Sequence, residues 1–495
     1  MNYIKIYIYL LTAAAIFAFG RQKSQLTDDT AASKAVFADK TAEYGLGKLA
    51  ESPAAWADFD NDGRVDLYAG GILWHNHEGK EFTPSRAGQG SGIAADFNND
   101  GFADIFSYSK LKLFQNKSAK GFKQIDIQLP KGIDADYVSL GAACGDFNND
   151  GYADIYVGGY ERWQKQKTYC DLIFINNAGK GFSAIKHDTN FRARGITACD
   201  FNEDGNIDIY VSNYRLQPNL LLVNDGKAGF RDMAQVYRAA ATDKPFKGGH
   251  SIGAAWADFD NDLHFDLFAG NFAHRDKRGD QPQSRFLRNT AEKGSYKFED
   301  LGPCGIHYQE SYASPAAGDF DNDGYVDLFF TTVYAAASFG VKNNSSLFKN
   351  GGDWNFTDVT KQSGLAGLKP TYQGAWADVN NDGFLDLVTA GRLFMNRGGG
   401  NHWLKLILKG DGKAVNSSAI GAQVRIKMQD STLTRQVEAG TGQGSQNGLT
   451  LHFGLGNNTD AVDIEIVWPD GKSRKISGAE PDSTRTISYK TAKQP

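Results

Sequence analysis

Several features are scarce in this sequence, and each scarcity narrows what the protein can be. It has no long run of lysine and arginine of the kind that tracks phosphates, so nucleic-acid binding is not expected. It has 9 histidines but no histidine-rich metal cluster and no nucleophile motif, which argues against catalysis. It has 4 cysteines: Cys144, Cys170, Cys199 and Cys304. Four cysteines allow three disulfide pairings, and small, buried, unpaired thiols fit the sequence at least as well.

Long apolar runs are also scarce. The run from Ile6 to Phe19 has about 14 residues, fewer than the about 20 that a membrane-spanning helix needs. It ends in small residues and predicts a secretory signal peptide over residues 1–20, and the polar residues 21–34 predict a flexible spacer. No cysteine follows the leader, so a lipid-modified N-terminus is not indicated. We therefore expect an exported protein, periplasmic, cell-surface or extracellular, with no transmembrane span in the mature chain.

What the sequence does contain is a repeated acidic loop. The first copy, Asp58 to Asp66, reads Asp-Phe-Asp-Asn-Asp-Gly-Arg-Val-Asp and places side-chain oxygens at positions 1, 3, 5 and 9, with glycine at the sharp bend at position 6. Calcium takes about 6 to 8 oxygen ligands, which carboxylates, a backbone carbonyl and water can supply. An EF-hand needs glutamate at position 12 and flanking helices, but position 12 is Ala69 and its neighbours alternate as in a strand. The loop is therefore predicted to bind calcium between strands.

One acidic turn alone would be ordinary turn chemistry, but this one recurs. Position 1 is Asp58, Asp96, Asp146, Asp200, Asp258, Asp319 and Asp378. Position 3 is Asp60, Asn98, Asn148, Asn202, Asp260, Asp321 and Asn380. Position 5 is Asp62, Asp100, Asp150, Asp204, Asp262, Asp323 and Asp382. Position 9 is Asp66, Asp104, Asp154, Asp208, Asp266, Asp327 and Asp386. These residues predict up to seven calcium ions as cofactors.

Each repeat also has a regular set of strands. We label them A, a small-residue strand before the loop; B, directly after it; C, a hydrophobic strand ending in asparagine; and D, a strand beginning with phenylalanine. Seven four-stranded units predict an all-β fold, a seven-bladed β-propeller over residues 35–397. The first D strand, at Phe37, precedes the first loop, and none follows Asn396. We therefore expect the N-terminal strand to complete the last blade and close the ring.

The pattern changes after the last repeat. Residues 398–491 contain alternating segments but no acidic loop, which predicts a small antiparallel β-sandwich. The predicted strands are Trp403 to Leu408, Gln423 to Met428, Leu433 to Val437, Leu449 to Phe453 and Val462 to Trp468.

These motifs resemble known families. The repeats, such as Asp319-Phe-Asp-Asn-Asp-Gly-Tyr-Val-Asp-Leu328, resemble the FG-GAP/VCBS repeats shared with integrin α-subunit propellers. The C-terminal stretches Asn401-His-Trp-Leu, Ala419-Ile-Gly-Ala422, Leu451-His-Phe-Gly-Leu-Gly456 and Trp468-Pro-Asp-Gly471 resemble the ASPIC/UnbV domain. The combination is similar to the cartilage acidic protein family over nearly the whole mature chain. The resemblance implies an exported calcium-binding protein, often of undefined activity.

Two loops depart from the family pattern. Loop 5 has Leu263 where glycine is expected, so its calcium site is expected to be distorted or weaker. Loop 4 has Glu203 at position 4, which adds charge and is expected to point outward.

The ligand-binding surface is predicted on the face opposite the calcium loops. The loops are A-to-B connections, whereas the long B-to-C insertions belong to the other face: Gly159 to Tyr169, Asn213 to Pro218, Gly270 to Gln283 and Val333 to Asn344. D-to-A residues expected near the axis there are Arg192, Arg194, His250, Glu310 and Tyr372.

Three functions fit this surface. Aromatic residues and arginines suit a binding or adhesion module for a protein or glycan. The alternative is a calcium-dependent exported enzyme, a cyclase or hydrolase with its pocket at the propeller axis, in which His250 and Glu310 form an acid and base pair. A third possibility is a structural surface-layer component. The rim could also be a set of solvated loops or a dock for the C-terminal domain.

Overall fold

A computed structural model describes residues 35–291, 296–338 and 340–489. The predicted leader and spacer lie outside these residues. The described chain is all-β: it has no α-helix, and only the 3-10 turn η1 (Trp163–Lys165) interrupts the strands. The described residues include no helix with the length and apolarity that crossing a membrane would require. The all-β propeller predicted from the sequence is confirmed.

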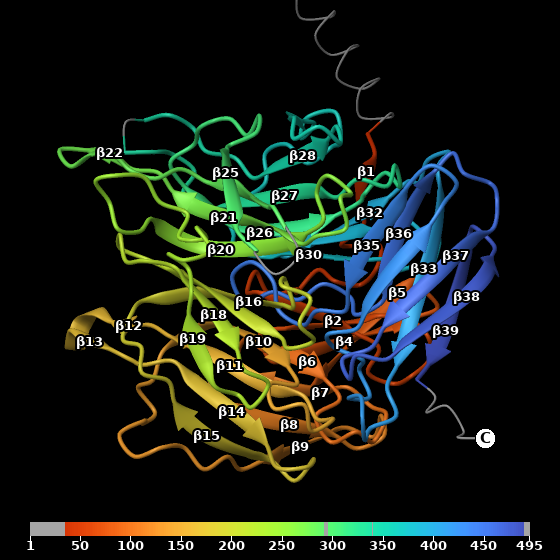
Figure 1. Cartoon of the computed structure of the whole chain (residues 1–495), viewed down its shortest axis with the longest axis horizontal. Coiled ribbons are helices and arrows are strands. Elements are labelled where there is room, and N and C mark those ends of the chain that lie inside the picture. Colours follow the sequence, from red (N-terminus) through yellow and green to blue (C-terminus); the bar gives the residue numbers. More distant parts are fainter. Residues whose placement is uncertain (1–34, 292–295, 339, 490–495) are drawn as a thin grey trace, which may run out of the picture.

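Seven four-stranded antiparallel sheets form the propeller, and each has the order A-B-C-D (Figure 1). The A strands are β2 (Ala54–Ala57), β6 (Ile93–Ala95), β10 (Ser139–Gly145), β16 (Ala193–Cys199), β20 (His250–Ala257), β26 (Tyr312–Gly318) and β30 (Gly374–Ala377). The B strands are β3 (Asp66–Ala69), β7 (Asp104–Ser107), β11 (Asp154–Gly159), β17 (Asp208–Asn213), β21 (Asp266–Phe272), β27 (Asp327–Thr332) and β31 (Asp386–Thr389). Neighbouring A strands pack against one another, so small side chains are needed there.

In six blades the C strand ends with the predicted asparagine and the D strand begins with the predicted phenylalanine; in blade 1 the two strands extend one residue further, to His77 and Glu81. The C strands are β4 (Ile72–His77), β8 (Lys112–Asn116), β14 (Leu172–Asn176), β18 (Leu220–Asn224), β24 (Arg285–Asn289), β28 (Ser346–Asn350) and β32 (Arg392–Asn396). The D strands are β1 (Phe37–Asp39), β5 (Glu81–Arg86), β9 (Phe122–Ile125), β15 (Phe182–Lys186), β19 (Phe230–Asp232), β25 (Phe298–Gly302) and β29 (Phe356–Asp358). The ring closes as predicted, because β1 pairs with β32 and sets Phe37 opposite Asn396.

The blades are joined by aromatic contacts between loops and D strands. In the first six loops the phenylalanine at position 2 packs on the D-strand phenylalanine of the next blade. Phe97 and Phe182, for example, have ring centroids 5.5 Å apart at an edge-to-face angle of 76°. These six loops are therefore anchored in the core between two blades, and position 2 of loop 7 is the buried Val379.

The C-terminal domain consists of two sheets. One has the order β36-β33-β39 and the other β35-β34-β37-β38. The strands are β33 (His402–Lys409), β34 (Gln423–Lys427), β35 (Thr432–Gln436), β36 (Leu451–Gly456), β37 (Val462–Val467), β38 (Ser473–Ala479) and β39 (Ser483–Ser488).

The prediction of a wholly antiparallel sandwich was wrong in one respect. Strands β38 and β39 were not predicted, and β39 pairs with β33 in parallel. Most residues of β38 are exposed, so its sequence lacks the apolar alternation that marks a half-buried strand. The chain then crosses from one sheet to the edge of the other, which makes the final pair parallel.

The C-terminal domain lies on the acidic-loop face of the ring. Figure 1 shows its blue strands on one side of the propeller, and β12 (Glu161–Arg162), β13 (Lys167–Thr168) and β22 (Arg275–Asp276) on the other. These hairpins belong to the B-to-C insertions. Docking of this domain on the insertion rim, one of the alternatives for that rim, is therefore wrong.

Candidate functional site

The seven acidic loops share one hydrogen-bonded framework. The position 1 carboxylate accepts the N–H of position 6 in every loop, as in Gly63 N to Asp58 Oδ2 at 3.0 Å. The position 5 carboxylate accepts the N–H of position 7, as in Arg64 N to Asp62 Oδ1 at 2.8 Å. These bonds fold each loop so that its side-chain oxygens converge.

The position 9 aspartates are buried in all seven loops. Asp66 Oδ1 accepts the N–H of Asn76, and its Oδ2 accepts the N–H of Phe59. Burial raises the pKa of Asp66, Asp104 and Asp154 to about 8 in each case, with neighbouring loop carboxylates adding to the effect. A nearby cation would relieve this cost by favouring the charged form.

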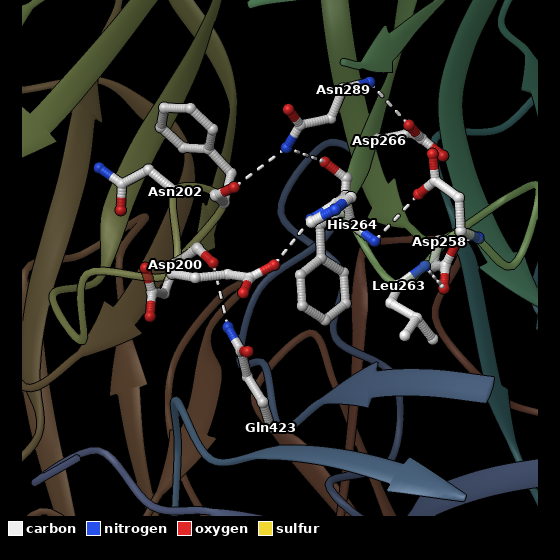
Figure 2. Close-up of polar contacts among 12 residues, drawn as sticks. Asp200, Asn202, Asp258, Leu263, His264, Asp266, Asn289 and Gln423 are labelled. Carbon is white, nitrogen blue, oxygen red and sulfur yellow. Dashed lines mark hydrogen bonds and ion pairs between the residues drawn. The ribbon is translucent and has the colours of Figure 1, made fainter. Parts of the chain in front are cut away.

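The asparagine that ends each C strand links its blade to the preceding one. Figure 2 shows Asn289, whose side-chain nitrogen donates to the carbonyl of Phe201 at 3.0 Å in loop 4 and to that of Phe265 at 3.2 Å in its own blade. The same cross-blade bond recurs in all seven blades. The loops and C strands thus form a continuous ring of hydrogen bonds.

The loops also fit a hard cation. Carboxylate oxygens of three loops lie within 4.8 Å of one another, in the sets Asp58-Asp60-Asp62, Asp258-Asp260-Asp262 and Asp319-Asp321-Asp327. Four buried carboxylate oxygens of the loops have no hydrogen-bond partner among the described residues: Asp58 Oδ1, Asp208 Oδ2, Asp260 Oδ1 and Asp321 Oδ1. Converging, unpaired carboxylate oxygens are the ligands that calcium prefers.

The two unusual loop residues take defined places. Leu263 has a φ of +80°, in the same left-handed region as the glycines at position 6 of the other loops. This conformation is strained for leucine. Glu203 is exposed, as expected. It lies 2.7 Å from His264 of loop 5 and 3.3 Å from Arg425 of the C-terminal domain (Figure 2 shows His264 and its bond). It therefore ties loops 4 and 5 to that domain.

The C-terminal domain makes direct polar contacts with the loops. Gln423 donates to the carbonyl of Asp200 at 3.0 Å (Figure 2), and Lys405 Nζ lies 2.5 Å from Asp378 Oδ2. Between this domain and the ring is a cavity of about 740 Å³, whose walls include acidic loop residues, Arg435 and Glu438. Burial raises the pKa of Glu438 to about 8.

A glycine-rich loop of the C-terminal domain fills the propeller axis. We call residues 439–448 the axial plug; the sequence analysis did not predict it, although the run of alternating glycines from Gly440 was a signal. A Cβ on Gly442 would lie 2.3 Å from Ser314 Oγ and 2.6 Å from the carbonyl of Pro315, so only glycine fits.

The plug pairs with the inner edges of the A strands. Gln446 contacts blades 1 and 2: its N–H donates to the carbonyl of Ala54 at 2.9 Å, and its Oε1 accepts the N–H of Ala94 at 2.8 Å. Similar bonds reach Cys144 of blade 3, Ala254 of blade 5 and Trp376 of blade 7. The plug thus satisfies strand edges that would otherwise be unpaired.

On the opposite face, several predicted residues do meet. The guanidinium of Arg194 lies over the rings of Tyr160, Tyr214 and Tyr372, at 5.3, 5.2 and 5.1 Å from their centroids. His250 packs against Tyr214, with ring centroids 4.8 Å apart. We call these five residues the mouth cluster. The sequence placed them correctly on one rim, but their mutual packing depends on the insertions.

The acid and base pair considered for His250 and Glu310 does not form directly. His274 Nδ1 lies 2.6 Å from Glu310 Oε1, and the imidazoles of His274 and His250 pack with centroids 5.0 Å apart. Burial opposes ionisation of Glu310, but hydrogen bonds from His274 and Ser338 outweigh it and lower its pKa. Both ring nitrogens of His250 are buried without a hydrogen-bond partner among the described residues, and burial lowers its pKa to about 3.

Arg192 lies beside the mouth cluster in a separate ion-pair network. Its Nε is 2.6 Å from Glu161, which also contacts Arg215 at 3.0 Å. Arg215 in turn lies over the ring of Trp163, 4.3 Å from its centroid, and Trp163 is 62% exposed. The insertion therefore presents an aromatic side chain to solvent above a network of ion pairs.

The cysteines form no disulfide in the described chain. All four are free thiols; Cys144 and Cys199 are buried, and Cys170 and Cys304 are half-buried. Of the alternatives that the sequence left open, the unpaired one is observed.

Comparison with known proteins gives two family matches. Residues 412–494 match the family described as ASPIC and UnbV. Residues 96–157 and 200–269 match the family described as FG-GAP-like repeat.

Curated relatives cover most of the chain. Cartilage acidic protein 1 of Mus musculus is 25% identical over 410 residues, which is 78% of this chain and 61% of that protein. The Homo sapiens protein of the same name is 26% identical over 308 residues, which is 60% of this chain and 44% of that protein. The chain thus spans less than two thirds of the length of these relatives.

Comparison with solved structures gives matches at low sequence identity. The BBS1N chain crystallised with ARL6DN is 9% identical, covers 73% of this chain and 98% of its own, and has a TM-score of 0.41. The Dos1 propeller is 11% identical, covers 68% of this chain and 75% of its own, and has a TM-score of 0.33.

Proposed function

We propose that this chain is an exported calcium-binding propeller that binds a protein or glycan. The chain contains FG-GAP-like repeats and an ASPIC/UnbV domain and is homologous to cartilage acidic protein 1. The single observation that carries the proposal is the separation of the two faces. The C-terminal domain lies on the loop face and its plug fills the axis from that side. The mouth cluster lies on the other face and is the surface available to a ligand.

The chemistry of the mouth face suits recognition of a polar macromolecule. Trp163 is 62% exposed and Tyr334 is 54% exposed, and both stand on insertions of the rim. Exposed aromatic rings next to arginines are typical of the residues that dominate binding energy in interfaces. Arg194 is preorganised by three tyrosines, so ordering it would cost little on binding.

Calcium has a structural role in this proposal. The loop carboxylates would hold the ion, and the ion would neutralise charge that burial makes unfavourable. Because each loop is clamped to the next blade, an ordered loop also stabilises the ring.

The ligand proposal can be tested with a matched set of variants. Wild type, Trp163→Ala, Arg194→Ala and the control Ile185→Ser would be applied to a glycan array and to a pull-down from the native extracellular milieu, with and without calcium. Ile185 is 47% exposed on an outer strand, β15, away from the mouth. We expect the mouth variants to lose the captured ligand and the control to retain it. Equal capture by all four proteins would refute the mouth as the binding site.

The alternative is a calcium-dependent exported enzyme, and one cavity on the insertion rim favours it. A cavity of about 410 Å³ is lined by His274, Glu310 and Ser338 together with Arg275, Asp276 and Arg278. Ser338 Oγ donates to Glu310 at 2.7 Å, so the base beside the serine is a carboxylate rather than an imidazole. A substrate screen compares wild type with His274→Ala. Turnover by wild type would detect an enzyme, and loss of that turnover in His274→Ala would place the chemistry in this cavity.

A further inference from the structure

The seven loops fall into two classes by the charge of the residue at position 3. Position 3 is aspartate in loops 1, 5 and 6 and asparagine in the other four loops. The residue before the terminal asparagine of the C strand varies in the same way. It is basic in blades 1, 5 and 6, namely His75, Arg288 and Lys349. It is uncharged in the others, namely Gln115, Ile175, Val223 and Met395. A carboxylate at position 3 of a loop is thus always accompanied by a basic residue just before the asparagine of the C strand.

In loops 5 and 6 this basic side chain lies on the carboxylates themselves. Arg288 Nε is 2.8 Å from Asp260 Oδ2, and its Nη2 is 3.1 Å from Asp262 Oδ2. Lys349 Nζ bonds Asp321 and lies 2.9 Å from Asp323 Oδ2. Positions 3 and 5 supply two of the oxygens that a calcium ion would need. The side chain therefore competes with an ion for the same ligands.

Loop 7 receives a cation from the C-terminal domain. Lys405 Nζ is 2.5 Å from Asp378 Oδ2 at position 1 and 2.9 Å from Asn381 Oδ1. The side chains of Lys405 and Asp378 are both 3% exposed, so this pair is shielded from water and salt. Displacing a buried ammonium would leave it without its charged partner, which is strongly unfavourable.

Loops 1 to 4 lack such a cation. Within the described part of the chain, no lysine or arginine forms an ion pair with their carboxylates at positions 1, 3, 5 or 9. His75 forms no ion pair with loop 1 among the described residues, and its Nε2 lies 2.9 Å from Ser85 Oγ. A ring nitrogen of His75 lies within 4.8 Å of carboxylate oxygens of Asp60 and Asp66, where an imidazole could serve as a further ligand of an ion. In loop 4, Asp208 is fully buried and its Oδ2 has no hydrogen-bond partner among the described residues. Asp260 Oδ1 and Asp321 Oδ1 of loops 5 and 6 also lack a hydrogen-bond partner among the described residues, but Arg288 and Lys349 neutralise those two carboxylates. No lysine or arginine of the described residues does so for Asp208, so its burial leaves a cost that a bound cation would compensate.

We propose that the loops are not equivalent: Arg288, Lys349 and Lys405 are built-in cations of loops 5, 6 and 7, and calcium occupies loops 1 to 4. This inference rests on the proposed calcium binding and replaces seven equal sites by four. Loop 1 has four carboxylates and no ion pair, so it fills at the lowest calcium concentration. The strained Leu263 in loop 5 is consistent with a loop that does not need to hold an ion.

Native mass spectrometry of the full chain in calcium counts the bound ions directly. We expect four ions on wild type, five on Arg288→Gln, five on Lys349→Gln and six on the double variant. Lys112→Gln is the control, because Lys112 lies on a C strand and bonds Gln89 at 3.2 Å, outside the loops; it should keep four ions. Both substituted ion pairs are partly exposed, so the variants should fold.

The outcomes separate the two proposals. Seven ions on wild type, or four on every variant, would overturn the built-in cations while leaving calcium binding intact. No bound ion on wild type would overturn calcium binding and this inference with it.

Discussion

Replacing Gln446 by leucine should destabilise the whole protein through the axial plug. Gln446 is fully buried, its Oε1 accepts the N–H of Ala94 at 2.8 Å, and its Nε2 donates to the carbonyl of Ala94 at 3.0 Å. Leucine fills the same space but leaves both main-chain groups of Ala94 without a partner. Each unsatisfied buried group costs about 1 to 3 kcal/mol, so the two groups together should lower the free energy of unfolding by about 2 to 6 kcal/mol.

The plug itself supplies the matched control. Gln443 is 3% exposed, and its Oε1 has no hydrogen-bond partner among the described residues. Its main-chain N–H bonds Ser314 Oγ at 2.8 Å, and that bond does not depend on the side chain. Gln443→Leu removes a poorly satisfied amide, so its free energy of unfolding should change by less than about 1 kcal/mol.

Denaturant unfolding of both variants measures the difference, and hydrogen exchange at the Ala94 amide measures the local effect. Protection of that amide should fall in Gln446→Leu and persist in Gln443→Leu. Equal stability of the two variants would refute the view that the plug satisfies the inner strand edges.

Three further outcomes are expected. Chelation should lower the melting temperature and added calcium should restore it; an unchanged melting temperature would show that calcium is not structural. Glu438→Gln should change the pH dependence of stability. The pKa of Glu438 is raised from 4.5 to about 8, so the folded state retains a proton that the unfolded state loses, and wild type loses stability as the pH rises from 4.5 to 8. The variant avoids this loss, so it should match wild type below pH 4.5 and exceed it by roughly 2 to 4 kcal/mol at pH 8; equal stability at pH 8 would contradict the buried carboxyl. Leu263→Gly should raise the free energy of unfolding by about 1 kcal/mol by relieving the φ of +80°, whereas Gly63→Leu, at φ +85° with open space around it, should lower it by about 1 to 2 kcal/mol. If both variants match wild type, the backbone of the loops is not strained.

The repeated loops show what the sequence alone could determine. Each unit encodes its own loop and strands through contacts between residues close in the chain, such as Gly63 with Asp58. Seven copies of one local motif then leave few global arrangements, and the surplus D strand at Phe37 shows how the ring closes. The face carrying Arg194, His250 and Tyr372 followed from strand order for the same reason.

The tertiary structure decided which of these residues meet. His274 stands between His250 and Glu310, and Lys405 reaches Asp378 from another domain, because the insertions and the C-terminal domain fold back over long separations in sequence. No local pattern specifies such contacts. The position of the axial plug likewise depends on the unpaired inner strand edges, which exist only once the ring has formed. The sequence by itself determined the blades, their acidic loops and the basic residues Arg288 and Lys349 beside loops 5 and 6, whereas packing between domains brought Lys405 to loop 7.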